Sequence, residues 1–294
     1  VEKPMATSAE DCDALRETAA RRATTLGVNQ NYIYNPAFAR LARHVKDRKL
    51  GRVLGVQAIY SMPLRQLAAR QFGHWMFAEP LNILLEQAVH PLSQLCFLTG
   101  EPQRIAASAG RPVEIAPGKS FFPEARIFFE GAGIPVQLHF AVGRSFPCQQ
   151  ITAICDDGIA TADVLNGRFI VQARTRWVDA VDSVVSGVAA GAMLMRDSFA
   201  GTLAYGLSML RLKGRSDPFF VSMRDSIAAF HAALDRGTTP VSDAALGAYA
   251  QRDKNVYAAG NRNNLRVSGM YTMGKAELHL NVGHADSYSK LSGS

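Results

Sequence analysis

The chain has 294 residues, of which 48% are hydrophobic and 19% are charged, as in a globular protein that buries a core. Its formal net charge is +7, but the basic residues are spread out, and the densest group, between residues 40 and 52, has the spacing of a solvated helix face, so we expect no nucleic-acid partner. Four cysteines lack metal-site spacing and are too few for a disulfide scaffold, which favours reduced thiols, a cytoplasmic location and no metal. Charged residues interrupt every apolar run before the ~20 residues of a membrane span, so no membrane partner is expected.

The first 34 residues have the pattern of one helix followed by one strand. Pro4 fixes its own backbone and restricts Lys3 to an extended conformation. Polar residues 7–10 predict a helix N-terminus, an amphipathic run follows, and residues 26–32 are typical of a short strand. We interpret residues 1–34 as the last unit of an alternating α/β domain, with its earlier strands and helices preceding Val1.

The next segment, to about residue 100, predicts helix, strand, loop and helix. Residues 37–49 form a basic amphipathic helix pattern, and residues 53–61 are rich in β-branched and apolar residues, as in a strand. A loop over residues 65–80 carries His74 and Trp75, and a helix over residues 82–98 carries Glu86 and His90.

A series of short strands follows, at residues 104–109, 125–130, 136–142, 149–155, 159–165 and 169–173. The turn residues at 156–158 and 166–167 indicate hairpins and hence antiparallel neighbours. Helices are expected at 180–213, 217–236 and 242–258, the first as a buried or interfacial insertion, and a hairpin at 270–282. We therefore expect an α+β fold with three parts: a dinucleotide-binding remnant (1–34), a substrate domain built on an open, mostly antiparallel sheet flanked by helices (35–260), and a tail of unassigned role (261–294).

Residues 136–142 alternate in polarity, which makes one face of the expected sheet markedly apolar. Val136, Leu138 and Phe140 share one face, and Gln137 and His139 share the other. If the helices cover only one face, the exposed face should be apolar and should pair with a second subunit.

Glu86 and His90 are four residues apart, so a regular helix would place them on one face. A carboxylate beside an imidazole raises the pKa of the imidazole and orients it, which suits a general acid/base near neutral pH. An ordinary helical Glu–His pair without a catalytic role is the alternative on geometry alone.

Several segments, taken in order, resemble the glucose–fructose oxidoreductase/inositol dehydrogenase (GFO/IDH/MocA) family. They are Glu2-Lys3-Pro4, residues 27–32, 35–38, 50–53, 86–92, 98–102, 230–234 and 237–241. The resemblance implies an NAD(P)-dependent oxidoreductase with a small sugar-like or cyclitol-like substrate, assembled as a homo-dimer or homo-tetramer through the open sheet.

The resemblance also implies roles for individual residues. His90 matches the proton shuttle of the family, Glu86 the acidic residue four positions before it, and Lys3 the lysine that contacts substrate oxygen and the nicotinamide end of the cofactor. Glu2, Lys3, Pro4 and Asn31 are expected at the cofactor. Tyr32, His74 and Trp75 are expected at the substrate, since Trp offers a flat apolar face to a sugar ring.

Three features differ from the family pattern or are missing. Glu86 replaces the usual Asp, Leu81-Asn82 stand where a Gly pair is common, and no G-x-G-x-x-G follows a predicted strand. The residue that would select NAD or NADP is therefore not identified. The chain alone is expected to be inactive, and the competing hypothesis is a non-catalytic ligand-binding or sheet-mediated dimerisation module.

Overall fold

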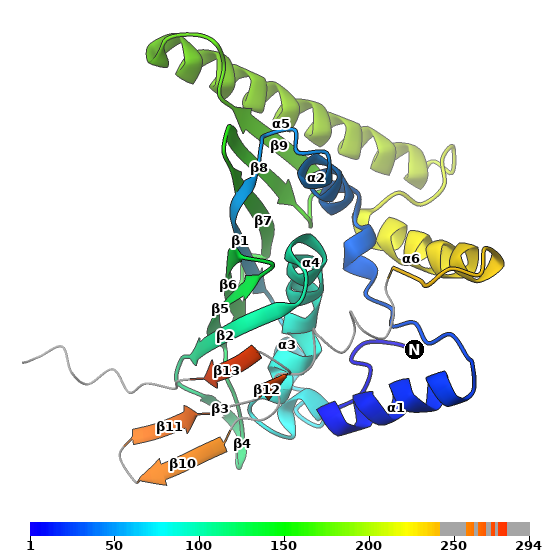
Figure 1. Cartoon of the computed structure of the whole chain (residues 1–294), viewed down its shortest axis with the longest axis vertical. Helices are drawn as coiled ribbons and strands as arrows, with labels where there is room; N and C mark the ends of the chain where they lie inside the picture. The colour runs from blue at the N-terminus through cyan, green and yellow to red at the C-terminus, as the bar shows by residue number, and fades with distance from the viewer. Residues whose placement is uncertain (242–256, 262–263, 269–271, 274–275, 281–294) are drawn as a thin grey trace, which may run out of the picture.

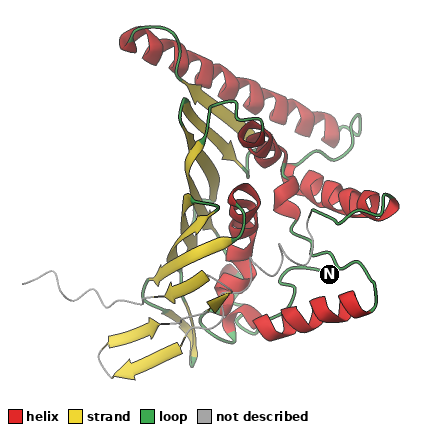
Figure 2. Ribbon diagram, viewed as in Figure 1, coloured by secondary structure: helices red, strands yellow, loops and turns green. Residues whose placement is uncertain are grey.

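The structure, a computed structural model, describes residues 1–241, 257–261, 264–268, 272–273 and 276–280. One large sheet carries helices on one side, and a long helix runs along one end of it (Figures 1 and 2). This arrangement confirms the expected α+β class with an open sheet flanked by helices.

The helical elements are α1 (Ala9–Arg21), η1 (Asn31–Tyr34), α2 (Pro36–Lys46), α3 (Arg65–Ala68), η2 (Trp75–Phe77), η3 (Leu84–Ala88), α4 (Val89–Thr99), α5 (Asp179–Met209) and α6 (Pro218–Asp235). The strands are β1 (Val53–Met62), β2 (Pro102–Ala109), β3 (Val113–Ala116), β4 (Lys119–Phe121), β5 (Glu124–Gly131), β6 (Ile134–Val142), β7 (Cys148–Cys155), β8 (Gly158–Asp163), β9 (Arg168–Ala173), β10 (Tyr257–Asn261), β11 (Asn264–Ser268), β12 (Thr272–Met273) and β13 (Ala276–Leu280). Each strand expected between residues 53 and 173 is present.

Among the described residues, the large sheet has nine strands in the order β12-β13-β2-β5-β6-β1-β7-β8-β9. Its pairs are antiparallel except β1 with β6 and β13 with β2, so the mostly antiparallel prediction is confirmed. The β7–β8 and β8–β9 hairpins use the predicted turns, and Gly158 takes φ +152°, a conformation that side chains rarely adopt. The hairpin expected at residues 270–282 is β12–β13, which adds to the sheet beside β2.

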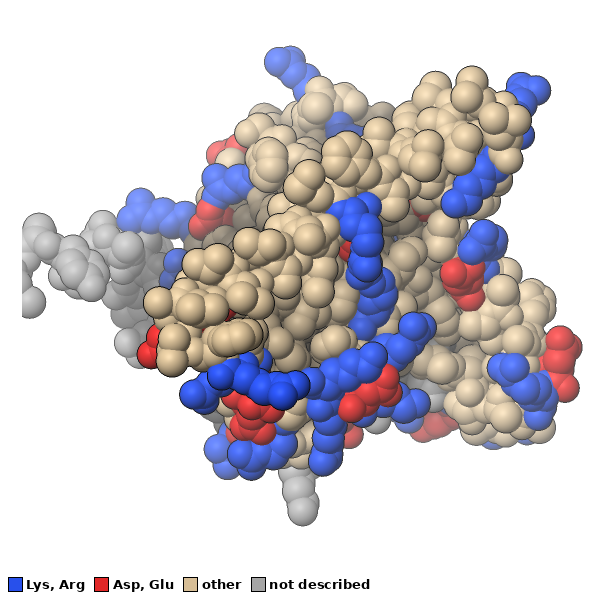
Figure 3. Space-filling model, turned by 90° about the horizontal axis from the view of Figure 1, so that it is seen from above, with Lys and Arg blue, Asp and Glu red and all other residues tan. Residues whose placement is uncertain are grey.

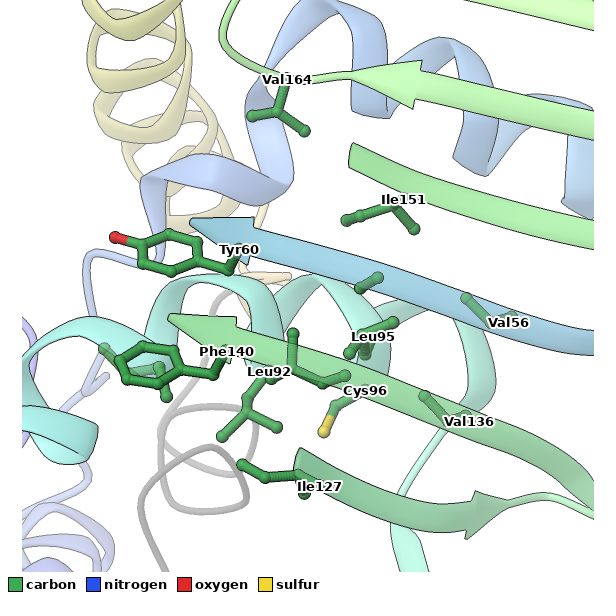
Figure 4. Close-up of a cluster of buried hydrophobic side chains, with 14 of the residues drawn as sticks. Val56, Tyr60, Leu92, Leu95, Cys96, Ile127, Val136, Phe140, Ile151 and Val164 are labelled. Carbon is green, nitrogen blue, oxygen red and sulfur yellow. The ribbon is translucent and has the colours of Figure 1, made fainter. Parts of the chain in front are cut away.

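The core lies between this sheet and the helices on its covered face. Val136, Leu138 and Phe140 of β6 are buried, and Tyr60 of β1 stacks on Phe140 with ring centroids 5.6 Å apart. Figure 4 shows Leu92, Leu95 and Cys96 of α4 directed at these strands. Alternation along each strand therefore separates a packed face from an open one.

The prediction of an exposed apolar sheet face was wrong in its assignment of the residues. The markedly apolar side, with Val136, Leu138 and Phe140, is the side that the helices bury, because burial of that surface drives the packing. The open side is mixed: Leu54, Ile59 and Phe128 are exposed on it, between polar neighbours such as Gln57 and Gln137.

Three local expectations differ from the structure. Residues 26–30 form no strand, because only Val1 pairs with this segment, and a 3-10 turn, η1, begins at Asn31. The helix expected over 82–98 is divided between the π-helical η3 and α4. The β3–β4 hairpin was not predicted. The helix expected at 242–258 lies almost entirely outside the described residues.

The long helix α5 is not buried, contrary to the alternative of a buried insertion. None of its 31 residues is buried, although it packs along β9 and is joined to α2 by a 2.6 Å ion pair between Arg40 and Asp197. Within the described residues, neither this helix nor any other combines the length and apolarity that crossing a bilayer requires.

Candidate functional site

Lys3 and Glu86 are joined by two hydrogen bonds of 2.8 Å from the Lys3 ammonium. One is accepted by the Glu86 carboxylate and the other by the Glu86 carbonyl. The side chains are only 15% and 18% exposed, so this charge pair is largely withdrawn from solvent. It connects the first residues of the chain to the helical segment that carries His90.

The π-helical turn η3 explains why Lys3 can bond a backbone carbonyl there. In a π-helix the Glu86 carbonyl would accept from the N–H of residue 91, but Pro91 has no N–H to donate. In an α-helix the proline ring would crowd the carbonyl four residues before it, that of Gln87, and would leave it without its usual donor. Lys3 supplies a donor to the Glu86 carbonyl instead.

Glu86 and His90 are therefore not the paired acid and base that a regular helix would give. Glu86 lies in the π turn and His90 follows in α4, so the two residues do not share one regular helix. Glu86 bonds Lys3, and no contact between Glu86 and His90 is found among the described residues.

The His90 imidazole is buried, with 9% of the residue exposed, and its Nδ1 has no hydrogen-bond partner in the described part of the chain. Burial, followed by the positive charge of Lys3, holds the pKa of His90 well below its ordinary value of 6.5. The expectation of a raised pKa is corrected: the ring is neutral at pH 7 and is able to accept a proton.

Tyr32 packs against His90 with ring centroids 4.5 Å apart, and burial raises the pKa of its hydroxyl above 10.0. Its backbone is fixed by a buried amide chain, in which Gln149 donates to Gln94 and Gln94 donates to the Tyr32 carbonyl, each at 2.9 Å. Tyr60 donates to Gln87 at 2.8 Å, and burial, with smaller effects of Tyr32 and Glu86, raises its pKa well above 10.0.

Sequence reasoning missed Tyr60, Gln87, Gln94 and Gln149. Gln94 gave a usable signal, because it is a long polar residue one helical turn after His90 in a mainly apolar helix. Tyr60 and Gln149 lie on strands far away in the sequence, and only the fold brings them to the site.

The other predicted cofactor residues line the contact between the chain start and α6. Glu2 accepts from Asn29 at 3.0 Å, and Ser226 of α6 donates to Asn29 at 2.7 Å. Asn31 is buried, and its amide donates to Ser222 of α6 at 3.2 Å. Pro4 follows Lys3 through a cis peptide bond.

His74 and Trp75 are tied to their own loop. His74 Nδ1 accepts from the Met76 amide at 3.3 Å, and the Trp75 carbonyl accepts from Asn82 at 3.1 Å. No hydrogen bond or ring contact within the described residues joins either side chain to Lys3, Glu86 or His90. Nor do the described residues include a cluster of three metal-ligating side chains.

Comparison with known proteins places this site in a known fold. The family model of the GFO/IDH/MocA C-terminal domain matches residues 38–160, which run from α2 to β8. No curated protein matches the sequence.

Many solved structures have a similar fold. An oxidoreductase from Agrobacterium radiobacter, in complex with NAD+, L-tartaric acid and magnesium, is 12% identical with a TM-score of 0.61, over 86% of this chain and 68% of that one. UDP-N-acetylglucosamine 3-dehydrogenase GnnA from Acidithiobacillus ferrooxidans is 18% identical with a TM-score of 0.56, over 85% and 65%. A myo-inositol dehydrogenase from Corynebacterium glutamicum is 15% identical with a TM-score of 0.56, over 85% and 66%.

At these identities the structures establish similarity of fold only, and this chain spans about two thirds of the length of each. The sequence match over residues 38–160 adds a similarity to one family over that segment. Residues 38–160 therefore resemble the C-terminal domain of the GFO/IDH/MocA family.

Proposed function

We propose that this chain carries the proton-transfer side of an NAD(P)-dependent oxidoreductase that interconverts a hydroxyl and a carbonyl on a sugar-like or cyclitol-like substrate. The observation that carries the proposal is the Lys3–Glu86 pair beside a buried His90 whose pKa is lowered. Perturbed titratable groups gathered in this way are characteristic of catalytic sites.

The residues present fit one end of the cofactor. The buried, unpartnered Nδ1 of His90 and the ammonium of Lys3 are polar groups suited to the nicotinamide and the reacting carbon's oxygen. A glycine-rich turn that would hold the pyrophosphate does not occur in the 294 residues. Bound NAD(P) supplies the hydride acceptor or donor.

In this proposal His90 takes the proton of the substrate hydroxyl and returns it in the reverse direction. A neutral imidazole is the form needed to accept a proton, and its lowered pKa keeps it neutral at pH 7. Lys3, held in place by Glu86, provides positive charge for the oxygen as negative charge develops there. Tyr32 holds the imidazole ring by packing against it.

The test needs a polypeptide that joins this chain to a complete dinucleotide-binding domain. We expect His90→Ala to lower kcat by about 100-fold or more, the usual contribution of a positioned acid/base, with an unchanged Kd for NADH. His139→Ala is the matched control, since His139 lies on the open face of β6. A His90→Ala enzyme with the kcat of the parent would remove the assigned role.

A non-catalytic module is the second candidate, and the open sheet face favours it. Ile59 and Phe128 are exposed there at 44% and 42%, which suits a homo-dimer or homo-tetramer built through the sheet. Absence of turnover with any sugar or cyclitol tested, together with sheet-mediated dimers, would support this function over the first.

A further inference from the structure

The helix α5 presents most of its large apolar side chains to solvent, and the residues on its sheet side are mainly small or acidic. The half-buried residues up to the middle of the helix are Asp182, Ser186, Ala190, Met193, Asp197 and Ser198, and those near its end are Ala204, Gly206, Leu207 and Ser208. Two of them are fixed there by hydrogen bonds: Asp182 accepts from the Thr175 amide at 2.6 Å and Asp197 from the Phe169 amide at 2.9 Å. This is the reverse of the arrangement expected for a helix that serves only its own core.

The outward side has the spacing of a helix–helix seam. Successive residues at alternating intervals of four and three are Val181, Val185, Val188, Ala192, Met195, Phe199, Thr202, Gly206 and Met209. This 3.5-residue repeat is sustained over the helix and is the pattern of a coiled-coil contact. Val188 and Phe199, near its middle, are each 68% exposed.

The surface around this seam is large and uncharged. No charged residue occurs at 183–195 or at 198–210. Figure 3, seen from above, looks onto this end of the molecule and shows broad uncharged surface there. The large apolar side chains that are exposed between Val181 and Leu212, on α5 and in the turn after it, have a combined accessible surface on the order of 1,000 Å². This is about the surface that one partner contributes to a stable protein interface.

Several glycines lie along the same helix, of which Gly187 and Gly191 are exposed and Gly206 is half-buried. Glycine weakens a helix relative to alanine. A β-carbon added at Gly187, Gly191 or Gly206 would meet no atom within 4 Å in the described structure, so these glycines accommodate nothing inside the chain. They are explained if another molecule approaches the helix backbone closely.

We propose that α5 pairs with α5 of a second copy of this chain, antiparallel, across a two-fold axis near the middle of the helix. One register satisfies the seam well: it places Val188 against Phe199 of the other copy and Ala192 against Met195. These two central layers each combine a larger with a smaller side chain, as close packing requires. A parallel pair would set Ala192 against Ala192 and Phe199 against Phe199.

The same register is favourable for the groups outside the seam. Arg196 meets Gly191 of the other copy, where the missing side chain leaves room. The acidic first turn, with Asp179, falls within about one helical turn of Arg211 of the other copy. Antiparallel helix dipoles add to this preference, whereas a parallel pair would bring the two acidic first turns together.

The experiment measures the mass of the 294-residue protein by sedimentation. The double variant Val188→Glu/Phe199→Glu places four carboxylates in the proposed seam and should halve the mass of the assembly. Because both side chains are 68% exposed, circular dichroism should be unchanged. Phe146→Glu, at a position 77% exposed in another part of the chain, is the matched control and should keep the mass of the parent.

A second comparison separates this interface from the sheet. Ile59→Glu on the open sheet face tests sheet-mediated assembly, and its effect should be independent of the α5 variant. A parent protein that stays monomeric, an α5 variant that retains the parent mass, or a monomer that binds lipid vesicles through α5 would overturn the proposal.

Crosslinking tests the direction of the pair. Val188→Cys/Phe199→Cys should give a disulfide-linked dimer on oxidation, while Val188→Cys alone should not. The two positions are too far apart along one helix to join within a chain. Efficient dimer formation by the single variant would refute the antiparallel arrangement.

Discussion

The Lys3–Glu86 pair gives a sharp test of how the first residues of the chain are held. Replacing Lys3 with Met keeps most of the side-chain volume but removes both 2.8 Å hydrogen bonds to Glu86. The carboxylate and its carbonyl then lose a charged donor in a place where Glu86 is only 18% exposed. Hydrogen bonds to charged groups contribute about 1.5–3 kcal/mol, so we expect a loss of about 2 kcal/mol of unfolding free energy.

A double-mutant cycle isolates the interaction. Lys3→Met, Glu86→Gln and the combined variant are compared by urea unfolding, and the coupling between the two sites should be about 1–2 kcal/mol. Arg16→Met/Asp13→Asn, at a more exposed ion pair of α1, is the control and should show a coupling below about 0.5 kcal/mol. A coupling at Lys3–Glu86 as small as that of the control would mean that solvent exchanges freely with this pair, and the reasoning would fail.

Three further outcomes follow from the structure. Because the pKa of His90 is lowered in the folded state, the unfolded chain takes up the proton first as the pH falls, so this contribution to stability is complete above about pH 6.5 and is lost below it. In His90→Gln the urea midpoint should therefore depend less on pH between about 5 and 7 than in the parent. An equal dependence in the two proteins would contradict the burial argument. Gly158→Ala should lower the free energy of unfolding by more than about 2 kcal/mol, since the new β-carbon would collide with the Gln172 carbonyl oxygen. Gly118→Ala is the control and should cost clearly less, because Gly118 also has a positive φ but a β-carbon there would meet no atom within 4 Å. Similar thermal midpoints for the two variants would refute the steric argument. Calorimetry of the 294-residue chain should show no micromolar NADH binding, since the sequence holds no pyrophosphate-binding turn, and such binding would overturn that part of the proposal.

Period-two patterns made most of the sheet predictable from the sequence. The strands between residues 53 and 173 alternate clearly, and Asp157-Gly158 and Asn166-Gly167 mark two hairpins that the structure contains. Such signals are local, so one sequence is sufficient to detect them. The face that the helices would cover depends on tertiary packing, and the prediction about the exposed face failed at that point.

For the candidate site, the sequence indicated individual residues but not their arrangement. Lys3 and Glu86 were both identified, yet the hydrogen bond from Lys3 to the Glu86 carbonyl depends on a π turn. Pro91 leaves that carbonyl without its helical donor, and Lys3 supplies one from a distant part of the chain. Helical periodicity alone predicts a regular turn and pairs Glu86 with His90. Likewise, the shift in the pKa of His90 was predicted in the wrong direction. The Glu86 carboxylate bonds Lys3 and not His90, so burial of the imidazole decides the shift and lowers the pKa.

The place of β1 in the middle of the sheet has a consequence for how the chain folds. Val56 pairs with Val136 on one side and with Ala153 on the other, so both neighbours of this central strand come from far along the chain. Contacts of this kind close large loops and slow folding. During synthesis β1 stays unpaired until β6 has emerged, and its second edge stays open until β7 follows, so its apolar run is exposed to aggregation in that interval. Slow refolding is therefore expected from the strand order itself.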